Sequence, residues 1–298
     1  RFQTKVGERS IDVRVSTIPM IYGESIVLRL LEQTKQVLTL EQIGFSKSDI
    51  EIYKRLIRQT AGIILVTGPT GSGKTTTLYA SLMAIKSVEK NIITIEDPVE
   101  YHLDFARQIQ INPKVNLTFA SGLRSILRHD PDIVMVGEIR DLETAEIAIQ
   151  AALTGHLVFS TLHTNDAPSA ITRLVNMGIE PFLVASCVKG VLAQRLIRVL
   201  CSCKKEKKMK LSVLCELLRL KPPNEEKEIT IFEVGVCQNC THTSYKGRIA
   251  IFEIMEMTDE IGTFTLNKQS SEEIKRMAVS GGMKTLQQSG LEKILAGI

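Results

Sequence analysis

The sequence predicts an α/β fold in which a parallel sheet carries helices on both faces. Short apolar segments alternate with helical segments between residues 46 and 177. A glycine-rich loop follows the first apolar segment, and acidic residues follow two of the others. Alternating strands and helices are typical of a parallel sheet. In such folds the residues after the strands meet at one edge and line the ligand crevice.

The expected elements follow in chain order. Residues 1–32 read as short strands, 33–45 as a polar linker, and 199–245 as a segment rich in cysteine and lysine. Residues 246–298 are predicted to form a C-terminal helical region, with helical patterning from about residue 261. Between the linker and the cysteine segment, the pattern predicts helices over 46–58, 74–86, 121–128, 143–153 and 168–177, and strands over 63–67, 92–95, 132–136 and 157–161.

Composition excludes several classes of protein. The chain has 298 residues and a net charge of +4, from 37 basic and 33 acidic side chains, which is too small to indicate nucleic-acid binding by itself. No apolar run approaches the ~18–20 residues of a membrane span. Six cysteines in a chain of this length fit a reducing compartment. The chain starts at Arg1 in a strand-like pattern, so we expect it to begin inside a domain.

A phosphate-binding loop is predicted at residues 68–75, which read GPTGSGKT. Its glycines let backbone N–H groups face phosphate oxygens, and the helix that follows presents its positive end to the same anion. Lys74 is placed to reach the β- and γ-phosphates, and the Thr75 hydroxyl to reach Mg²⁺. The alternative is an ordinary turn between strand and helix, which a match at every required position disfavours. The candidate nucleotide-binding residues are Gly68, Pro69, Thr70, Gly71, Ser72, Gly73, Lys74, Thr75 and Thr76.

Acids and histidines follow or flank other predicted strands. Glu96 and Glu100 come after the strand at 92–95, and Glu138 after the strand at 132–136. Carboxylates at this edge can bind Mg²⁺ or polarise an attacking water. His156 and His163 bracket the strand at 157–161, where an imidazole could contact a γ-phosphate or a water. The alternatives are solvated rim charges and hydrogen-bonded structural histidines.

Four cysteines suggest a structural metal site. Cys237 and Cys240 form a CxxC pair, and Cys201 and Cys203 form a shorter CxC pair. Four thiolates would hold zinc in a closed, tetrahedral and hence structural site. Because CxC is less usual, His242 or Cys215 remain possible substitutes, and two pairs of reduced thiols are the alternative to any metal. The lysines between residues 204 and 210 could favour an anionic lipid surface or nucleic acid, but a solvated loop is the favoured interpretation.

Four ordered motifs resemble those of a secretion ATPase. They are GPTGSGKTTTL at 68–78, IEDPVE at 95–100, DPDIVMVGEIRD at 130–141, and the segment from TGH at 154–156 to TLH at 161–163. Together they are similar to the assembly ATPase of type II secretion and to its relative that extends type IV pili. The resemblance covers nearly the whole chain.

The resemblance implies a division of the chain. Residues 1–32 would be the remainder of a small, PAS-like α+β domain, joined by the 33–45 linker to a RecA-like P-loop domain at 46–198. A zinc-binding module at 199–245 and the C-terminal helices at 246–298 would follow.

The resemblance also implies residue roles. Lys74 and Thr75 would be the Walker A pair. Glu96, Asp97 and Glu100 would form an acidic box in which Glu100 activates water, Glu138 would be the Walker B acid acting through Mg²⁺, and His156 and His163 would form a histidine box. Arg14 and Arg29, and by the same reasoning Arg9, are expected to reach a nucleotide across a subunit boundary. One departure is the CxC pair, because the family's assembly motors carry CxxC on both sides of this module.

The function implied is that of a homo-hexameric ATPase that uses ATP and Mg²⁺ and holds one zinc per chain. It would work with inner-membrane platform proteins at the cytoplasmic face of a bacterial inner membrane and assemble a pseudopilus for protein export. The alternatives are a type IV pilus extension motor, a nucleic-acid translocase and a nucleotide-gated scaffold. A retraction motor would lack the cysteine module. We expect no nucleic-acid partner, because the charge is near neutral and Trp is absent.

Overall fold

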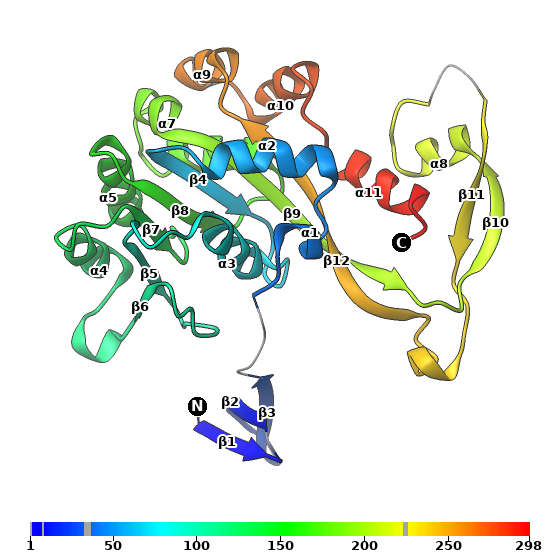
Figure 1. The fold of residues 1–298 in the computed structure, drawn as a ribbon, viewed down its shortest axis with the longest axis horizontal. Helices are drawn as coiled ribbons and strands as arrows, with labels where there is room; N and C mark the ends of the chain where they lie inside the picture. The colour runs from blue at the N-terminus through cyan, green and yellow to red at the C-terminus, as the bar shows by residue number, and fades with distance from the viewer. Residues whose placement is uncertain (1, 8, 33–36, 223–225) are drawn as a thin grey trace.

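The computed structural model describes residues 2–7, 9–32, 37–222 and 226–298, and the strands within these residues form three sheets (Figure 1). The first is a small antiparallel sheet in the order β1-β2-β3. Its strands are β1 (Phe2–Val6), β2 (Arg9–Met20) and β3 (Gly23–Glu32). The pairing of β2 with β3 places Arg14 directly opposite Arg29, so both side chains leave the same face of the sheet.

A seven-stranded sheet in the order β12-β9-β4-β8-β7-β5-β6 forms the centre of the molecule. All neighbours are parallel except β12, which is antiparallel to β9. The strands are β4 (Gly62–Thr67), β5 (Ile92–Glu96), β6 (Arg107–Gln110), β7 (Ile133–Val136), β8 (Leu157–Leu162), β9 (Val188–Leu200) and β12 (Tyr245–Glu256). Every residue of β4, β5, β7 and β8 is buried, as expected for strands covered on both faces. The predicted α/β fold is therefore confirmed.

Helices cover both faces of this sheet. Ile64 and Val66 of β4 point to one apolar cluster, while Ile63 and Leu65 point to the other. The first cluster is covered by α1 (Leu40–Ile43), α2 (Lys47–Ile57) and α3 (Lys74–Ile85). The second is covered by α4 (Phe119–Ile126), α5 (Leu142–Leu153), α6 (Ala167–Asn176), α7 (Pro181–Cys187), α9 (Asp259–Leu266) and α10 (Ser271–Ser280).

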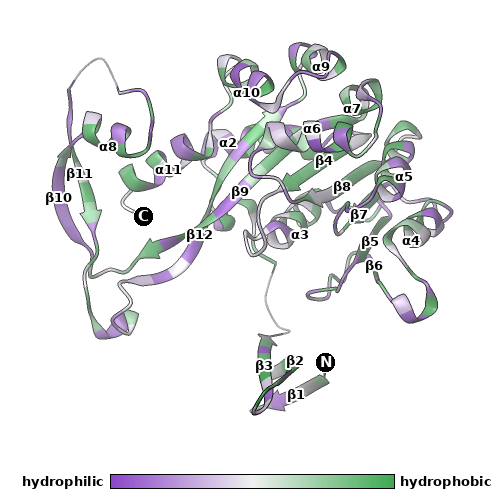
Figure 2. Ribbon diagram, turned by 180° about the vertical axis from the view of Figure 1, so that it is seen from behind, coloured by the Kyte–Doolittle hydropathy of each residue, from purple (hydrophilic) through white to green (hydrophobic). Residues whose placement is uncertain are grey.

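The strands β9 and β12 form a long ribbon that leaves the central sheet. β9 pairs with β4 only as far as Ala193, and the rest of β9 continues with β12 toward the cysteine module (Figure 1). The module contains the antiparallel pair β10 (Lys205–Lys210) and β11 (Glu228–Glu233), together with α8 (Leu211–Leu217). Figure 2 shows that β10 is hydrophilic along its length, in contrast to the hydrophobic β4, β7 and β8.

The prediction of a helical region over 246–298 is wrong for its first part. Residues 245–256 form β12, and the helices begin only at Asp259. β12 is a strand because it pairs with β9, more than 40 residues earlier in the chain, over a register from Glu256↔Gly190 to Arg248↔Arg198. Such pairing leaves no local signal in the sequence. Of the predicted linker, residues 33–36 lie outside the described residues, and residues 40–43 form α1.

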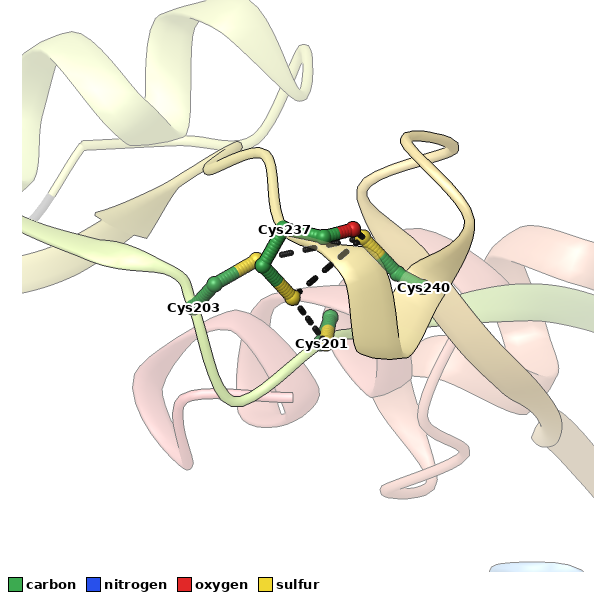
Figure 3. A group of neighbouring side chains, drawn as sticks. All are labelled: Cys201, Cys203, Cys237 and Cys240. Atoms are coloured by element: carbon green, nitrogen blue, oxygen red, sulfur yellow. Dashed lines mark hydrogen bonds between the residues drawn. The ribbon is translucent and has the colours of Figure 1, made fainter.

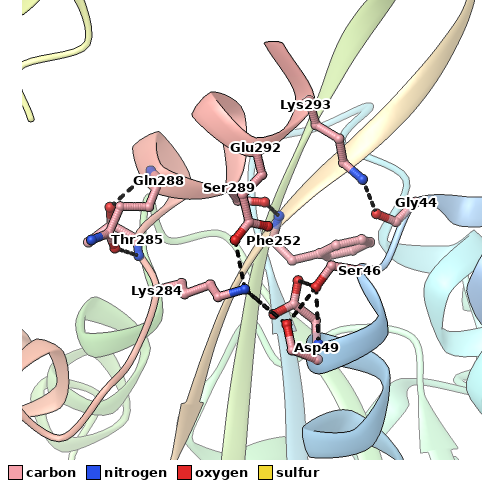
Figure 4. Close-up of polar contacts among 11 residues, drawn as sticks. Gly44, Ser46, Asp49, Phe252, Lys284, Thr285, Gln288, Ser289, Glu292 and Lys293 are labelled. Carbon is pink, nitrogen blue, oxygen red and sulfur yellow. Dashed lines mark hydrogen bonds and ion pairs between the residues drawn. The ribbon is translucent and has the colours of Figure 1, made fainter. Parts of the chain in front are cut away.

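The last helix, α11 (Leu286–Leu295), is held to the first helices by ionic contacts (Figure 4). Lys284 Nζ lies 3.6 Å from Asp49 Oδ1 and 2.8 Å from Glu292 Oε1. Lys293 Nζ donates to the Gly44 carbonyl oxygen at 2.6 Å. The C-terminal helix is thereby tied to the P-loop domain. None of the helices in the described segments has the length and apolar character needed to cross a membrane.

Candidate functional site

The predicted phosphate loop lies between β4 and α3. Gly68, Gly71 and Gly73 have φ angles of 148°, 77° and 88°, which side chains other than glycine rarely adopt. A Cβ atom on Gly68 would lie 2.5 Å from the Gln194 carbonyl oxygen, so the loop passes close to β9. No side chain caps the first turn of α3, which leaves its N–H groups available for an anion. The buried Ser72 hydroxyl has no hydrogen-bond partner among the described residues. These features fit a bound phosphate group.

Lys74 is folded back onto its own loop. Its Nζ donates to the carbonyl oxygens of Gly68 at 2.8 Å and Pro69 at 3.1 Å. Burial lowers the pKa of Lys74, and the nearby Glu138 carboxylate opposes this effect. An anion at the loop would offer the ammonium group stronger partners than two neutral carbonyls.

A buried glutamine of β9 fixes the loop from behind. Gln194 Nε2 donates to the Ser72 carbonyl oxygen at 2.6 Å, and its Oε1 accepts from the Thr77 hydroxyl at 2.8 Å. The sequence analysis missed this residue, because it lies about 120 positions after the loop and belongs to a strand whose pairing is long-range. No spacing or motif could have indicated it.

A cavity of about 710 Å³ opens beside the loop. It brings together residues from the small N-terminal sheet, the phosphate loop and the segments after β5, β7 and β8. Those of its lining residues that the sequence predicted are Arg14, Arg29, Thr70, Gly71, Ser72, Gly73, Lys74, Thr75, Thr76, Glu96, Asp97, Glu100, Glu138 and His163. It follows that most of the predicted site residues lie around one space, next to the phosphate loop.

The acidic loop after β5 holds two carboxylates in different environments. Glu96 is only 3% exposed and accepts hydrogen bonds from Tyr79, Thr94 and Gln108. Burial raises the pKa of Glu96, although these donors oppose the shift. Glu100 is more open, and its Oε1 lies 3.1 Å from the Arg14 guanidinium. Of the two acids, Glu100 is therefore the one that can reach a bound molecule.

Glu138, which follows β7, is paired with two side chains. Arg140 lies 2.5 Å from Glu138 Oε1, and His163 Nε2 lies 3.3 Å from Oε2. The hydrogen bond to Glu138 raises the pKa of Arg140. His163 thus contacts the predicted Walker B acid, whereas Arg140 was not among the predicted site residues. The sequence could have indicated Arg140 only through its position, two residues after Glu138.

One prediction about this site needs correction. His156 precedes β8 and bonds the Ala151 carbonyl at 2.9 Å, whereas His163 follows the same strand. Because a six-residue strand spans ~20 Å, the two histidines lie at opposite edges of the sheet and only His163 borders the cavity. Arg14 contacts Glu100 of its own chain, and the expectation that it reaches a nucleotide across a subunit boundary stays a prediction. The side chain of Arg9 lies outside the described residues.

The four predicted cysteines converge at the base of the module (Figure 3). Their sulfur atoms all lie within 4.8 Å of one another, with Cys201–Cys237 at 3.8 Å, Cys203–Cys240 at 4.0 Å and Cys237–Cys240 at 3.7 Å. Zn–S bonds of ~2.3 Å in a tetrahedron require sulfur separations of about 3.8 Å. The donor set therefore fits zinc, and the CxC pair reaches the metal position without help from the suggested substitutes, His242 or Cys215.

Three lysines of β10 are paired with acids. Lys208 lies 3.8 Å from Glu228, and Lys210 lies 3.0 Å from Glu226 across the β10–β11 pair. Lys207 contacts Glu233 in the same way. These contacts favour the interpretation of a solvated surface over that of an anion-binding patch.

Comparison with known proteins decides the family. The family model described as Type II/IV secretion system protein matches residues 1–298. The chain belongs to this family. It is 50% identical over its full length to type II secretion system protein E of Pseudomonas aeruginosa, and 45% identical over 98% of its length to the type IV pilus assembly ATPase PilB of Myxococcus xanthus. It spans 59% of the first relative and 51% of the second.

Solved structures of this kind of fold support the architecture. The Legionella pneumophila ATPase DotB superimposes with a TM-score of 0.71 at 21% identity, covering 100% of this chain and 73% of DotB. The pilus retraction motor PilT, crystallised with bound ADP, superimposes with a TM-score of 0.62 at 27% identity, covering 97% of this chain and 75% of PilT. The chain therefore has the fold that DotB and PilT share.

Proposed function

We propose that this chain is the motor part of a type II secretion ATPase and hydrolyses ATP to drive pseudopilus assembly and protein export. One observation carries the proposal. The cavity beside the phosphate loop joins Lys74, Glu100, Glu138 and Arg14 in a chain that is half identical, along its whole length, to a type II secretion system protein E.

The phosphate loop would bind the nucleotide. Its N–H groups and the Ser72 hydroxyl would face phosphate oxygens, and Lys74 would exchange its two carbonyl partners for the β- and γ-phosphates. The Thr75 hydroxyl and the Glu138 carboxylate would hold Mg²⁺, directly or through water, since oxygen donors are what this ion prefers. Bound there, Mg²⁺ would neutralise charge on the phosphates.

Glu100 would orient the attacking water and accept its proton. Its carboxylate lies on the cavity and has a single ionic partner in the described part of the chain, Arg14. Arg14 and Arg29 would supply positive charge where negative charge develops on the γ-phosphoryl group. His163, bonded to Glu138, would orient that acid.

The cysteine cluster would hold one structural zinc ion, with Cys201, Cys203, Cys237 and Cys240 as a closed set of four sulfur ligands. No position would remain for a substrate, so this metal would stabilise the module and take no part in hydrolysis.

Assembly and location follow from the same proposal. The chain would act as a homo-hexamer that converts hydrolysis into domain rotation, bound to inner-membrane platform proteins at the cytoplasmic face of the membrane. A type IV pilus extension motor is the second candidate, favoured by 45% identity to PilB of Myxococcus xanthus.

An assay of ATP hydrolysis with three additions tests the proposal. The chain would be measured alone, with single-stranded DNA, with vesicles of anionic lipid, and with the cytoplasmic part of a type II platform protein. We expect Mg²⁺-dependent hydrolysis that the platform protein stimulates and that Lys74→Ala abolishes. Stimulation by DNA alone would instead indicate a translocase, and the absence of turnover in every arm a nucleotide-gated scaffold.

A further inference from the structure

A buried tyrosine–glutamate pair lies at the inner wall of the cavity, between α3 and the loop that carries Glu100. Tyr79 is 0% exposed and Glu96 is 3% exposed. The Tyr79 hydroxyl donates to Glu96 Oε2, and the Glu100 backbone N–H donates to the Tyr79 oxygen over 3.4 Å. The pair therefore connects the helix that begins at Lys74 to the backbone of the residue proposed to act on water.

The same carboxylate fixes the loop at two more points through Gln108 of β6. Gln108 Nε2 donates to Glu96 Oε1 and to the Tyr101 carbonyl oxygen, both at 3.2 Å, and its Oε1 accepts from the Leu103 backbone N–H at 2.8 Å. Thr94 of β5 adds a further donor to Glu96 Oε1 at 2.6 Å. The backbone of the acidic loop is thus bonded to one buried network at three positions.

The contacts of Glu96 differ from those expected of a metal ligand or a general base. Both carboxylate oxygens accept hydrogen bonds from protein donors, which is the pattern of an ionised acid with its charge satisfied inside the protein. Glu96 also borders the cavity, but Glu100 and Glu138 differ from it because they have ionic partners that can exchange. Glu96 is therefore suited to hold its neighbours in place.

We propose that Glu96 and Tyr79 are positioning residues that fix the backbone of Glu100 relative to the phosphate loop, and that neither contacts the nucleotide or the metal ion. This inference rests on the proposed function and corrects the role that the family resemblance implied for Glu96. A misplaced general base lowers the rate of the chemical step with little effect on binding, because binding depends on the phosphate loop itself.

The test compares two buried tyrosines, one that belongs to α3 and one that bonds to α3 from α2. Tyr79→Phe removes only the hydroxyl that joins Glu96 to Glu100. Tyr53→Phe is the matched control, because Tyr53 is also 0% exposed and bonds Ser81 of α3 at 2.8 Å, away from the acidic loop. We expect Tyr79→Phe to lower kcat about tenfold and to leave ATP affinity and half-saturating Mg²⁺ within about twofold, since a hydrogen bond to a charged group is lost. Tyr53→Phe should lower the Tm without changing kcat.

Glu96→Gln extends the test. It should give the same loss of kcat, and the double variant should be no worse than the worse single variant, because the two side chains act as one unit. Amide hydrogen exchange should become faster in the loop 97–106 of Tyr79→Phe and stay unchanged in β4. Thr94→Val, which removes one donor to the same carboxylate, serves if Glu96→Gln does not fold.

Two results would overturn the inference while leaving the proposed function intact. One is an unchanged kcat in Tyr79→Phe, in a preparation where Lys74→Ala is inactive. The other is an approximately tenfold shift of half-saturating Mg²⁺ in Glu96→Gln, which would make Glu96 a metal ligand. If the unchanged chain shows no hydrolysis that depends on Lys74, the proposed function itself fails, and this inference fails with it.

Discussion

Removing the metal from the cysteine cluster is expected to disorder the module at the end of the β9–β12 ribbon and to leave the nucleotide site intact. The perturbation is either chelation or Cys237→Ser. Cys237 is the critical choice, because its sulfur lies 3.8 Å from that of Cys201 and 3.7 Å from that of Cys240. Its loss leaves three ligands and opens the tetrahedron.

The size of the effect follows from how little else stabilises the module. Apart from cysteines, Leu214 and Ile231 are the buried apolar side chains among its described residues. Burial of two such side chains is worth about 3–6 kcal/mol together, whereas ordering each residue of the segment costs ~1–2 kcal/mol of backbone entropy. A structural zinc site contributes ~10–16 kcal/mol of apparent binding free energy. A bound zinc ion would therefore be the larger stabilising contribution.

Elemental analysis and hydrogen exchange together measure this effect. The unchanged chain should contain one zinc, and so should Cys215→Ser, the control, because Cys215 is a buried cysteine of the module outside the cluster. Cys237→Ser should contain almost none. In that variant amide exchange should rise in β10 and β11 and remain slow in β4 and β8. Zinc-free protein with slow exchange in β10 would refute the reasoning and show that packing alone holds the module.

Three further perturbations have defined outcomes. Arg14→Ala should reduce kcat by up to ~10³-fold, more than it reduces ATP affinity. Because Arg14 is expected to act across a subunit boundary, mixing this variant with Lys74→Ala should restore part of the activity, whereas no recovery would place its action within the chain where it contacts Glu100. Gln194→Leu should lower the free energy of unfolding by about 2–6 kcal/mol in urea titrations, since it leaves two buried polar partners unpaired; a loss below ~1 kcal/mol would contradict this. Gly235→Ala should lower zinc content and Tm, because its Cβ would lie 1.8 Å from a cysteine carbonyl oxygen. Gly290→Ala, with nothing within 4 Å of the added Cβ, is the control and should keep its zinc content with no loss of Tm, since Ala is favoured over Gly inside a helix.

The parts of the fold that depend on local pattern could be predicted from the sequence. The strands β4, β5, β7 and β8 begin and end within one residue of the predicted bounds. Such strands can be recognised from a continuous apolar run that is bounded by glycine or charged residues, whichever strands they pair with. The strand character of β12 could not be predicted in this way, because it depends on pairing with β9 across the whole cysteine module.

The candidate site shows the same division. The phosphate loop and Glu138 carry their positions in short motifs, and the cavity contains them. A motif does not show how deeply a side chain is buried. The sequence therefore could not distinguish the buried Glu96 from the accessible Glu100, and it could not show that Tyr79 joins them. The prediction that His156 and His163 share one site was wrong because the two residues flank the same strand. Only residues after the C-terminal end of that strand lie beside the cavity.

The most direct test of the central claim is the ratio of ATP binding to ATP turnover in Glu100→Gln. The claim is that Glu100 activates water at a phosphate loop that binds ATP without its help. We expect the variant to bind ATP within about twofold of the unchanged chain and to hydrolyse it roughly 10²–10⁴-fold more slowly, because an amide cannot accept the proton. Turnover equal to that of the unchanged chain would contradict the account.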